Sequence, residues 1–121
     1  MRYLSVLFAS QPDTPPPPEL FEAIMTLGQE ATAAGVMLDM GGLLPQTRTD
    51  ITVSSDELSV LDGPFTETKE LISYVVYEVR SKEDVVEWTR RFMDLHRTLW
   101  PGWTGTSRIV QVMTPGGEPP A

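Results

Sequence analysis

The sequence predicts an α+β fold in which a ferredoxin-like sheet carries two helices on one face. One observation is the order of the expected elements, which is strand, helix, strands, long strand, helix and strand. Right-handed crossovers fold two successive strand–helix–strand units into such a sheet. The other observation is that the strands expected at residues 2–9 and 72–79 are apolar on both faces, which is typical of strands buried on both sides. Because two helices cover only one face, we expect a homodimer in which a second copy covers the other.

The composition is that of one globular domain. The chain has 121 residues, of which 40% are hydrophobic, and a chain of this length can bury a hydrophobic core. We expect residues 1–114 to form a single domain. Residues 115–121 consist mainly of proline and glycine and predict a flexible C-terminal tail.

Charge and rare residue types exclude several classes of function. The chain has no cysteine and one histidine, which excludes disulfides and thiol catalysis and argues against a zinc site. We therefore expect no metal and no cofactor. A net charge of −8 argues against a nucleic-acid partner, since such surfaces need clustered Lys and Arg. No apolar run is long enough for a membrane span or a signal peptide, and we expect a cytoplasmic protein with no membrane partner.

The first half of the chain alternates one strand with one helix. After the strand at 2–9, four consecutive prolines at Pro15–Pro18 predict a stiff extended loop whose last proline begins a helix. A docking ligand for another protein is the alternative for this run. Residues 19–34 predict the helix, and Gly35 follows where a left-handed cap is expected. Its apolar residues recur at helical spacing: Leu20, Ile24, Leu27, Ala31 and Ala34.

Shorter strands follow the first helix. Residues 36–44 predict a second strand, and residues 49–54 and 58–61 predict two more, joined by a turn at Asp56 and Glu57. The strongest strand pattern lies at 72–79, where apolar residues occupy both faces. We therefore expect an added hairpin between the second strand and this long one.

The second helix begins after Ser81, which can cap it with Asp84 three residues on as a capping-box-like partner. The apolar stripe of this helix consists of Val85, Trp88, Phe92 and Leu95. His96 stands at the end of the helix, where the dipole favours a cation. We therefore expect His96 to lie outside any cleft and to be replaceable by glutamine.

The end of the chain combines an aromatic loop with a strand. Residues 97–105 predict an irregular loop, and residues 107–113 predict the last strand. Trp100 and Trp103 in the loop can close one end of the barrel or line a pocket. The pattern leaves both uses open.

Residues 62–70, which read Asp-Gly-Pro-Phe-Thr-Glu-Thr-Lys-Glu, concentrate charge between two expected strands. Gly63 and Pro64 predict a tight turn, and Asp62 can cap it through its carboxylate. A tight turn accounts for Asp62, Gly63 and Pro64. It does not account for the charged and polar residues that follow, because a loop between two strands does not require them. We predict that Phe65 anchors the turn rather than offering a stacking surface.

Three residues of this loop are candidate catalytic groups: Asp62, Glu67 and Lys69. A carboxylate beside a lysine can transfer protons if burial shifts its pKa toward neutrality. The candidate ligand-binding residues are Asp62, Gly63, Pro64, Phe65, Thr66 and Glu70. The structural alternative is a salt bridge that ties the loop to the fold or to a dimer mate.

The stretch from Asp62 to Glu70 resembles the signature of the DGPF (DGPFAETKE) group of YCII-related proteins, with one conservative change. The resemblance covers nearly the whole chain apart from the proline run and the last residues. Other matching segments are the opening Met1-Arg2-Tyr3-Leu4, the run Ala34-Gly35-Val36-Met37-Leu38 ahead of Gly-Gly-Leu-Leu-Pro, and the strand from Ile72 to Val79. The resemblance implies a dimeric α/β barrel, in agreement with the fold class predicted above.

The His-Asp pair proposed for the YCII family does not transfer to this chain. The first helix has no histidine, and His96 is the only one present. Close DGPF relatives tend to have an acidic residue just before the Gly-Leu that Gly42 and Leu43 match. Gly41 stands there instead, and Asp39 two residues earlier could substitute from the same face of the strand.

These observations predict a protein that binds or transforms a small polar metabolite at a cleft beside the 62–70 loop. The alternative is a non-catalytic dimeric binding or regulatory module in which the loop is structural. Catalysis requires a titratable pair in an enclosed pocket, whereas a binding module requires the pocket alone.

Overall fold

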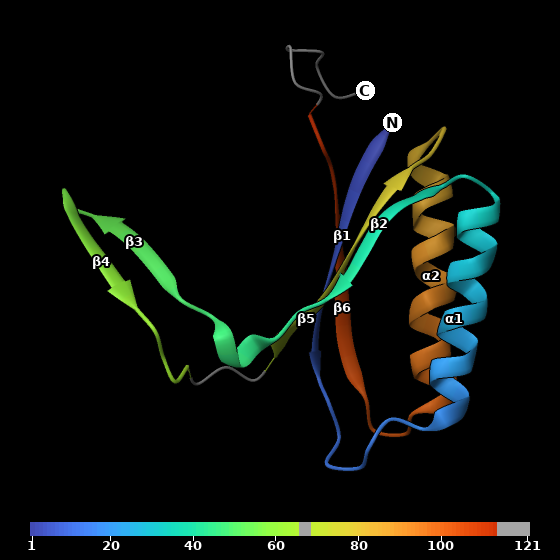
Figure 1. Ribbon diagram of the computed structural model, residues 1–121, viewed down its shortest axis with the longest axis horizontal. Helices are drawn as coiled ribbons and strands as arrows, with labels where there is room; N and C mark the ends of the chain where they lie inside the picture. The colour runs from blue at the N-terminus through green and yellow to red at the C-terminus, as the bar shows by residue number, and fades with distance from the viewer. Residues whose placement is uncertain (66–68, 114–121) are drawn as a thin grey trace.

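Four antiparallel strands and two helices form the body of the fold (Figure 1). The computed structural model describes residues 1–65 and 69–113, so Thr66, Glu67 and the expected tail at 115–121 lie outside the described residues. The sheet has the order β2-β5-β1-β6. Its strands are β1 (Arg2–Ser10), β2 (Met37–Gly42), β5 (Glu70–Glu78) and β6 (Thr104–Gln111).

The helices α1 (Pro18–Ala33) and α2 (Lys82–Leu99) both lie on one face of this sheet (Figure 1). This arrangement confirms the predicted α+β fold and is consistent with its ferredoxin-like form. The core fills the space between the sheet and the helices. Leu20 from α1 is 2% exposed and Val85 from α2 is 0% exposed. The buried strand residues that face them are Tyr3, Leu7, Val75 and Tyr77.

Both helices begin as their sequences predict. Pro18 occupies the first turn of α1, where its missing N–H would have no partner in any case. Gly35 follows that helix with a φ of +73°, the left-handed conformation that glycine adopts without strain. At α2, the Asp84 backbone N–H donates to the Ser81 hydroxyl oxygen at 3.2 Å, which satisfies one of the unpaired donors of the first turn.

The other face of the sheet, away from the helices, is apolar and uncovered in the single chain. Register places Leu4 beside Val76 in β5 and beside Val110 in β6. Val110 is 50% exposed, although a strand residue of this kind favours burial. We call this surface the open face. Its members that matter below are Leu4, Val6, Phe8, Tyr74, Val76, Arg108 and Val110.

A separate two-stranded sheet projects from the body of the fold on the side opposite the helices (Figure 1). Its strands are β3 (Asp50–Ser54) and β4 (Glu57–Leu61), and we call residues 50–61 the hairpin arm. The turn lies at Ser55 and Asp56, with φ of 51° and 64°, one residue earlier than predicted. Positive φ at both central residues matches the right-handed twist of the two strands.

Three predicted element ends are wrong by a few residues. The strand expected at 36–44 stops at Gly42, because Pro45 begins a short 3₁₀ helix, η1 (Pro45–Thr47). The loop expected at 97–105 starts later, because α2 continues to Leu99. The strand expected at 107–113 begins at Thr104, because β1 pairs with it as far as Ser10.

His96 lies near the end of α2 and outside the pocket linings, as predicted, but the prediction that it is a cation there is wrong. The side chain is 6% exposed, and its ring contacts those of Phe92 and Trp103 at centroid distances of 4.7 and 4.4 Å. Its Nδ1 lies 2.9 Å from the Phe92 carbonyl oxygen, which can only accept, so Nδ1 carries the proton. Burial lowers the pKa of His96 against the smaller opposing effect of this hydrogen bond. His96 is therefore a neutral core residue.

Trp100 follows α2 directly and packs against the loop that precedes α1. It is 4% exposed, and its indole N–H donates to the Thr14 hydroxyl at 3.3 Å. Trp103 packs on His96 and lines a second pocket beside Arg97 and Thr104, which is the second of the two uses expected for these tryptophans. Closure of a barrel end stays a prediction. In the described part of the chain, neither helix is long and apolar enough to cross a membrane.

Candidate functional site

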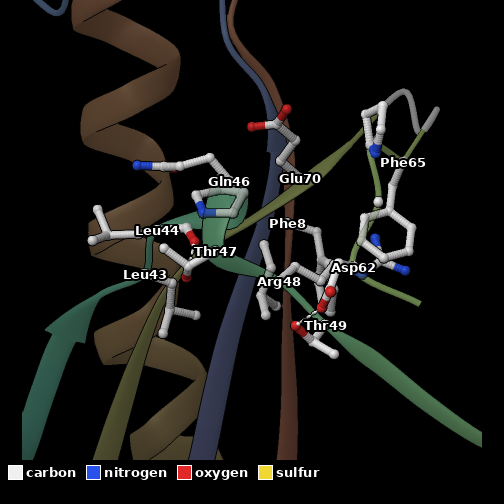
Figure 2. A pocket seen from close by; sticks show the side chains of 14 residues that line it. Phe8, Leu43, Leu44, Gln46, Thr47, Arg48, Thr49, Asp62, Phe65 and Glu70 are labelled. Atoms are coloured by element: carbon white, nitrogen blue, oxygen red, sulfur yellow. Dashed lines mark hydrogen bonds between the residues drawn. The ribbon is translucent and has the colours of Figure 1, made fainter. Parts of the chain in front are cut away.

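A pocket of about 900 Å³ lies where the hairpin arm joins the sheet (Figure 2). Three segments that are distant in sequence meet there. One connects β2 to β3, the second follows β4, and the third consists of the adjoining ends of β1 and β5. The lining residues are Phe8, Leu43, Leu44, Pro45, Gln46, Thr47, Arg48, Thr49, Asp62, Gly63, Pro64, Phe65, Glu70 and Leu71.

The segment from Leu43 to Thr49 forms one wall, which is held to the sheet at Leu43 and stiffened by an internal turn. The Leu43 backbone N–H donates to the Ile72 carbonyl oxygen at 2.8 Å, which extends the pairing of β2 with β5 beyond Gly42. Thr47 then closes the 3₁₀ turn, with its hydroxyl donating to the Leu44 carbonyl oxygen at 2.7 Å. This wall is therefore fixed to the sheet independently of the hairpin arm.

Arg48 joins the two walls. Its Nε and Nη2 donate to the two carboxylate oxygens of Asp50 at 2.9 and 2.8 Å, a bidentate geometry that suits the planar guanidinium. The same guanidinium lies 3.8 Å from the centroid of the Phe65 ring, within the range of a cation–π contact. The hydrogen bonds from Arg48 hold the pKa of the Asp50 carboxyl below its usual value, so this carboxylate stays ionised.

A hydrogen bond between Thr49 and Asp62 ties the two legs of the hairpin arm together. The Thr49 hydroxyl donates to Asp62 Oδ1 at 2.7 Å. Thr49 immediately precedes β3 and Asp62 immediately follows β4. The predicted cap of the turn by Asp62 is therefore replaced by a cross-strand bond at the base of the hairpin, one register step beyond the Asp50–Leu61 pair.

Gly63 is required by the shape of the loop. Its φ is +92°, a conformation that strains any residue with a side chain. A Cβ at this position would lie 2.9 Å from two ring carbons of Phe65. The loop thus places Phe65 over the backbone of Gly63 and under Arg48. Phe65 packs on the turn as predicted, but the prediction that it offers no stacking surface is wrong, because Arg48 stacks on its ring.

The structure brings most of the described candidate residues to the pocket. Asp62, Gly63, Pro64, Phe65 and Glu70 all line it. Lys69 is exposed and is not a lining residue. Thr66 and Glu67 lie outside the described residues, so the expected carboxylate–lysine pair stays a prediction.

The sequence reasoning missed the other nine lining residues, and two of them matter most. Thr49 was assigned only to the start of a strand and Arg48 to no element, yet they supply the hydroxyl and the guanidinium that organise the site. The available signal was a run of hydrogen-bonding side chains, Gln46 to Asp50, directly after Pro45. Such a run is more polar than a short connection requires.

Asp39 and Tyr74 form a second polar pair on the open face, outside the residues that line the pocket. The Tyr74 hydroxyl donates to Asp39 Oδ2 at 2.8 Å, and this bond raises the pKa of the phenol. Gly41 makes the contact possible, since a Cβ there would lie 2.6 Å from the tyrosine ring. Asp39 and Gly41 share a face, as predicted, but this carboxylate holds a tyrosine rather than supplying an acid to the pocket.

The pocket combines apolar walls with an excess of negative charge. Arg48 is paired with Asp50, whereas Asp62 and Glu70 add two carboxylates to the lining. Among the described residues, Asp62 accepts one hydrogen bond, through Oδ1, which leaves Oδ2 able to accept another. The arrangement can therefore bind a molecule that donates hydrogen bonds and that has an apolar part for Phe8, Leu71 and the prolines.

Comparison with known proteins adds one distant structural likeness. No protein-family model and no curated protein matches the sequence. The crystal structure of a putative monooxygenase from Shewanella loihica PV-4 is similar at 17% sequence identity, over 93% of this chain and 95% of that chain, with a TM-score of 0.34. A likeness at this TM-score carries no argument about the activity of the present chain.

Proposed function

We propose that this chain binds a small polar metabolite in the pocket at the base of the hairpin arm, as a member of the DGPF group of YCII-related proteins. The observation that carries the proposal is that five of the six described residues of the 62–70 loop line the pocket. The residues that line the cavity include five candidates that were predicted from the sequence alone: Asp62, Gly63, Pro64, Phe65 and Glu70. A cavity of about 900 Å³ lies within the usual range for small-molecule sites.

The charges of the pocket select the class of ligand. A bound anion would face Asp62 and Glu70, and Asp50 already offsets the charge of Arg48 through two of the five guanidinium N–H donors. A neutral or cationic molecule with hydroxyl or amino donors meets no such repulsion. We therefore expect a small neutral or cationic metabolite that donates to Asp62 and places its apolar part against Phe65.

The hydrogen bonds among the polar residues of the pocket favour binding over catalysis. Arg48 already bonds to Asp50, and Thr49 to one oxygen of Asp62, without a ligand. Acid–base catalysis needs a group whose proton is exchanged with the substrate at a pKa near the working pH. The preformed network suits recognition, and a transformation of the ligand would rest on the predicted pair of Glu67 and Lys69.

The test is a thermal-shift screen with metabolites grouped as neutral, cationic and anionic. A compound at 100 times its Kd stabilises the folded state by about 2.7 kcal/mol, so a binder of the expected class raises Tm clearly. Asp62→Asn removes the charge while its amide oxygen still accepts from Thr49. Asp56→Asn, at the exposed hairpin turn, is the matched control, because asparagine tolerates the left-handed conformation found there.

The expected result is that a neutral or cationic compound stabilises the wild type and Asp56→Asn but not Asp62→Asn. Two outcomes contradict the proposal. One is a set of binders that are all anionic. The other is equal stabilisation of both variants by every binder, which would place the ligand elsewhere.

We also propose that the chain is a homodimer that covers the open face. Val76 lies on this face, in register with Leu4, whereas Val75 faces the helices and is 8% exposed. Val76→Asp should convert the dimer to a monomer, and Val86→Asp, on the exposed surface of α2, should not. Light scattering at micromolar concentration distinguishes the two, and a wild type that is monomeric there would contradict the proposal.

A further inference from the structure

A second pocket, of about 420 Å³, lies between the C-terminal half of α2 and the start of β6. Because α2 forms one of its walls, we call it the helix-side pocket, whereas the hairpin arm projects on the other side of the sheet (Figure 1). The two pockets share no lining residue. A volume of this size is within the usual range for small-molecule sites, so the helix-side pocket is a separate candidate site.

Trp103 supplies the aromatic wall of the helix-side pocket, and two contacts fix the position of its ring. One is with the buried, neutral His96, at a centroid distance of 4.4 Å. The other is with Gly105, where a Cβ would lie 2.5 Å from a ring carbon of Trp103. A residue with a side chain at position 105 would therefore displace the ring. Glycine at the start of β6 allows the indole to lie across the strand.

Met93 extends this wall from the side of α2. Its sulfur accepts a hydrogen bond from the Ser107 hydroxyl of β6 at 3.1 Å, which restrains an otherwise flexible side chain. Thioether sulfur and indole rings both pack favourably against aromatic rings. The pocket thus presents a preformed apolar surface that suits the flat ring of a ligand.

The charged groups that line the pocket are two guanidiniums and one carboxylate, from Arg90, Arg97 and Asp94. Among the described residues, Arg97 donates through Nε and Nη2 to Asp94, and Arg90 donates through the same atoms to Glu87. Each pair takes two of the five N–H donors of its guanidinium, so donors of both arginines remain for a ligand. The lining has more positive than negative charge, the reverse of the pocket at the base of the hairpin arm.

The net charge of −8 opposes the approach of an anion from a distance. At physiological ionic strength, however, charges more than about 8 Å apart are largely screened. The side chains that line the pocket therefore outweigh the rest of the molecule in the choice of ligand.

We propose that the helix-side pocket binds a small aromatic carboxylate. The ring of the ligand packs against Trp103 and Met93, and its carboxylate accepts hydrogen bonds from Arg90 and Arg97. The planar donors of a guanidinium match the two oxygens of a carboxylate. A cationic ligand would face both guanidiniums, and a neutral ring would gain the packing alone. The proposal does not depend on the ligand of the other pocket, whose lining favours the opposite charge.

The test compares three probes that share one ring system and differ in charge. They are 2-naphthoate, 2-naphthamide and 2-naphthylmethylamine, which are anionic, neutral and cationic at neutral pH. The dissociation constant, Kd, of each probe is measured with the full chain by isothermal titration calorimetry. The place of binding is followed by nuclear magnetic resonance through the indole N–H signal of Trp103, which Trp103→Phe identifies.

Three matched arginine variants separate direct contact from net charge. Arg90→Gln and Arg97→Gln alter the pocket, whereas Arg91→Gln alters the same helix at a residue that does not line it. Each variant removes one positive charge and leaves one carboxylate without its arginine, which is Glu87, Asp94 or Glu30, respectively. The control therefore matches the pocket variants both in charge and in the loss of an ion pair. Circular dichroism checks that each variant folds.

We expect 2-naphthoate to bind more tightly than either analogue and to shift the Trp103 indole signal. Arg90→Gln and Arg97→Gln should each raise its Kd about three- to tenfold and leave the Kd of 2-naphthamide unchanged. Arg91→Gln should change neither. Raising the NaCl concentration from about 0.05 to 0.5 M should weaken the binding of 2-naphthoate, because salt screens the attraction between the charges.

Four outcomes overturn the proposal. They are no binding of 2-naphthoate, a Kd for the amide or the amine equal to or below that of the acid, binding that leaves the Trp103 signal in place, and an effect of Arg91→Gln as large as that of Arg97→Gln. The last outcome would show that 2-naphthoate makes no contact with the guanidiniums of the pocket.

Discussion

Three glycine-to-alanine substitutions provide a graded test of the backbone and of the pocket loop. Gly28 lies inside α1 with nothing near its missing Cβ, so alanine there should stabilise the fold by about 0.5–1 kcal/mol. Gly35 has a φ of +73° and also has open space. Alanine there meets only the cost of the left-handed conformation, about 1–2 kcal/mol. Gly63 combines a φ of +92° with the Phe65 ring at 2.9 Å.

Gly63→Ala therefore carries two costs. The left-handed conformation again costs about 1–2 kcal/mol. The alanine Cβ in addition pushes the Phe65 ring away and removes its contact with Arg48, which is worth about 0.5–1 kcal/mol at a partly exposed site. The total is about 1.5–3 kcal/mol. For a chain of this length, each kcal/mol lowers Tm by about 4 °C, so the drop is about 6–12 °C.

A double-mutant cycle isolates the second cost. Urea unfolding is measured for the wild type, Gly63→Ala, Phe65→Leu and the double variant. If Phe65 packs over Gly63 and under Arg48, the excess cost of Gly63→Ala over Gly35→Ala should disappear in the Phe65→Leu background. An unchanged excess would refute the packing of this loop. A Gly63→Ala variant as stable as the wild type would refute its backbone conformation.

Three further substitutions test other parts of the fold. The pKa of His96 is lowered in the folded state, so the unfolded chain takes up the proton first and the free energy of unfolding should fall as pH drops below about 6.5. His96→Gln is neutral at every pH and should flatten this part of the pH dependence, measured by urea unfolding. An unchanged slope would contradict the burial of His96. Ser81→Ala should cost about 1 kcal/mol, because the Asp84 N–H loses its acceptor; a chemical denaturation midpoint equal to the wild type would disprove the cap. Gly41→Ala should displace the ring of Tyr74 and lower its pKa toward the usual value, since the hydrogen bond that raises it is lost; an ultraviolet titration identical to the wild type would show that the ring does not lie there.

The body of the fold was predictable because its pattern is local. The helical stripe of α1 and the alternation in β5 report burial residue by residue, and burial follows from the periodicity of each element. Ser81 and Gly35 mark helix ends through their own hydrogen bonds and dihedral angles. Each of these features depends on residues within one turn or one strand step. The sequence therefore contains the whole signal.

The site was less predictable because its key contacts join distant segments. Thr49 bonds to Asp62 across the hairpin, and Arg48 stacks on Phe65 only because the loop folds back. No local period marks either contact. His96 was misplaced for a related reason. Its helical position is ordinary, but Trp103 from the following loop covers its ring, and only tertiary structure brings the two together.

The pairing of Arg48 with Asp50 decides what the pocket can bind. A free arginine in an apolar cleft would recruit carboxylates or phosphates, since its planar donors match their oxygens. Here a bidentate carboxylate two residues away in the same segment takes two of the five N–H donors and offsets the positive charge, so Arg48 attracts an anionic ligand less strongly than an unpaired arginine would. Asp62 is less fully used, because its hydrogen bond from Thr49 occupies only one of its two carboxylate oxygens. The lining thus carries more negative than positive charge, and a neutral or cationic ligand with hydroxyl or amino donors is the chemical complement of this pocket.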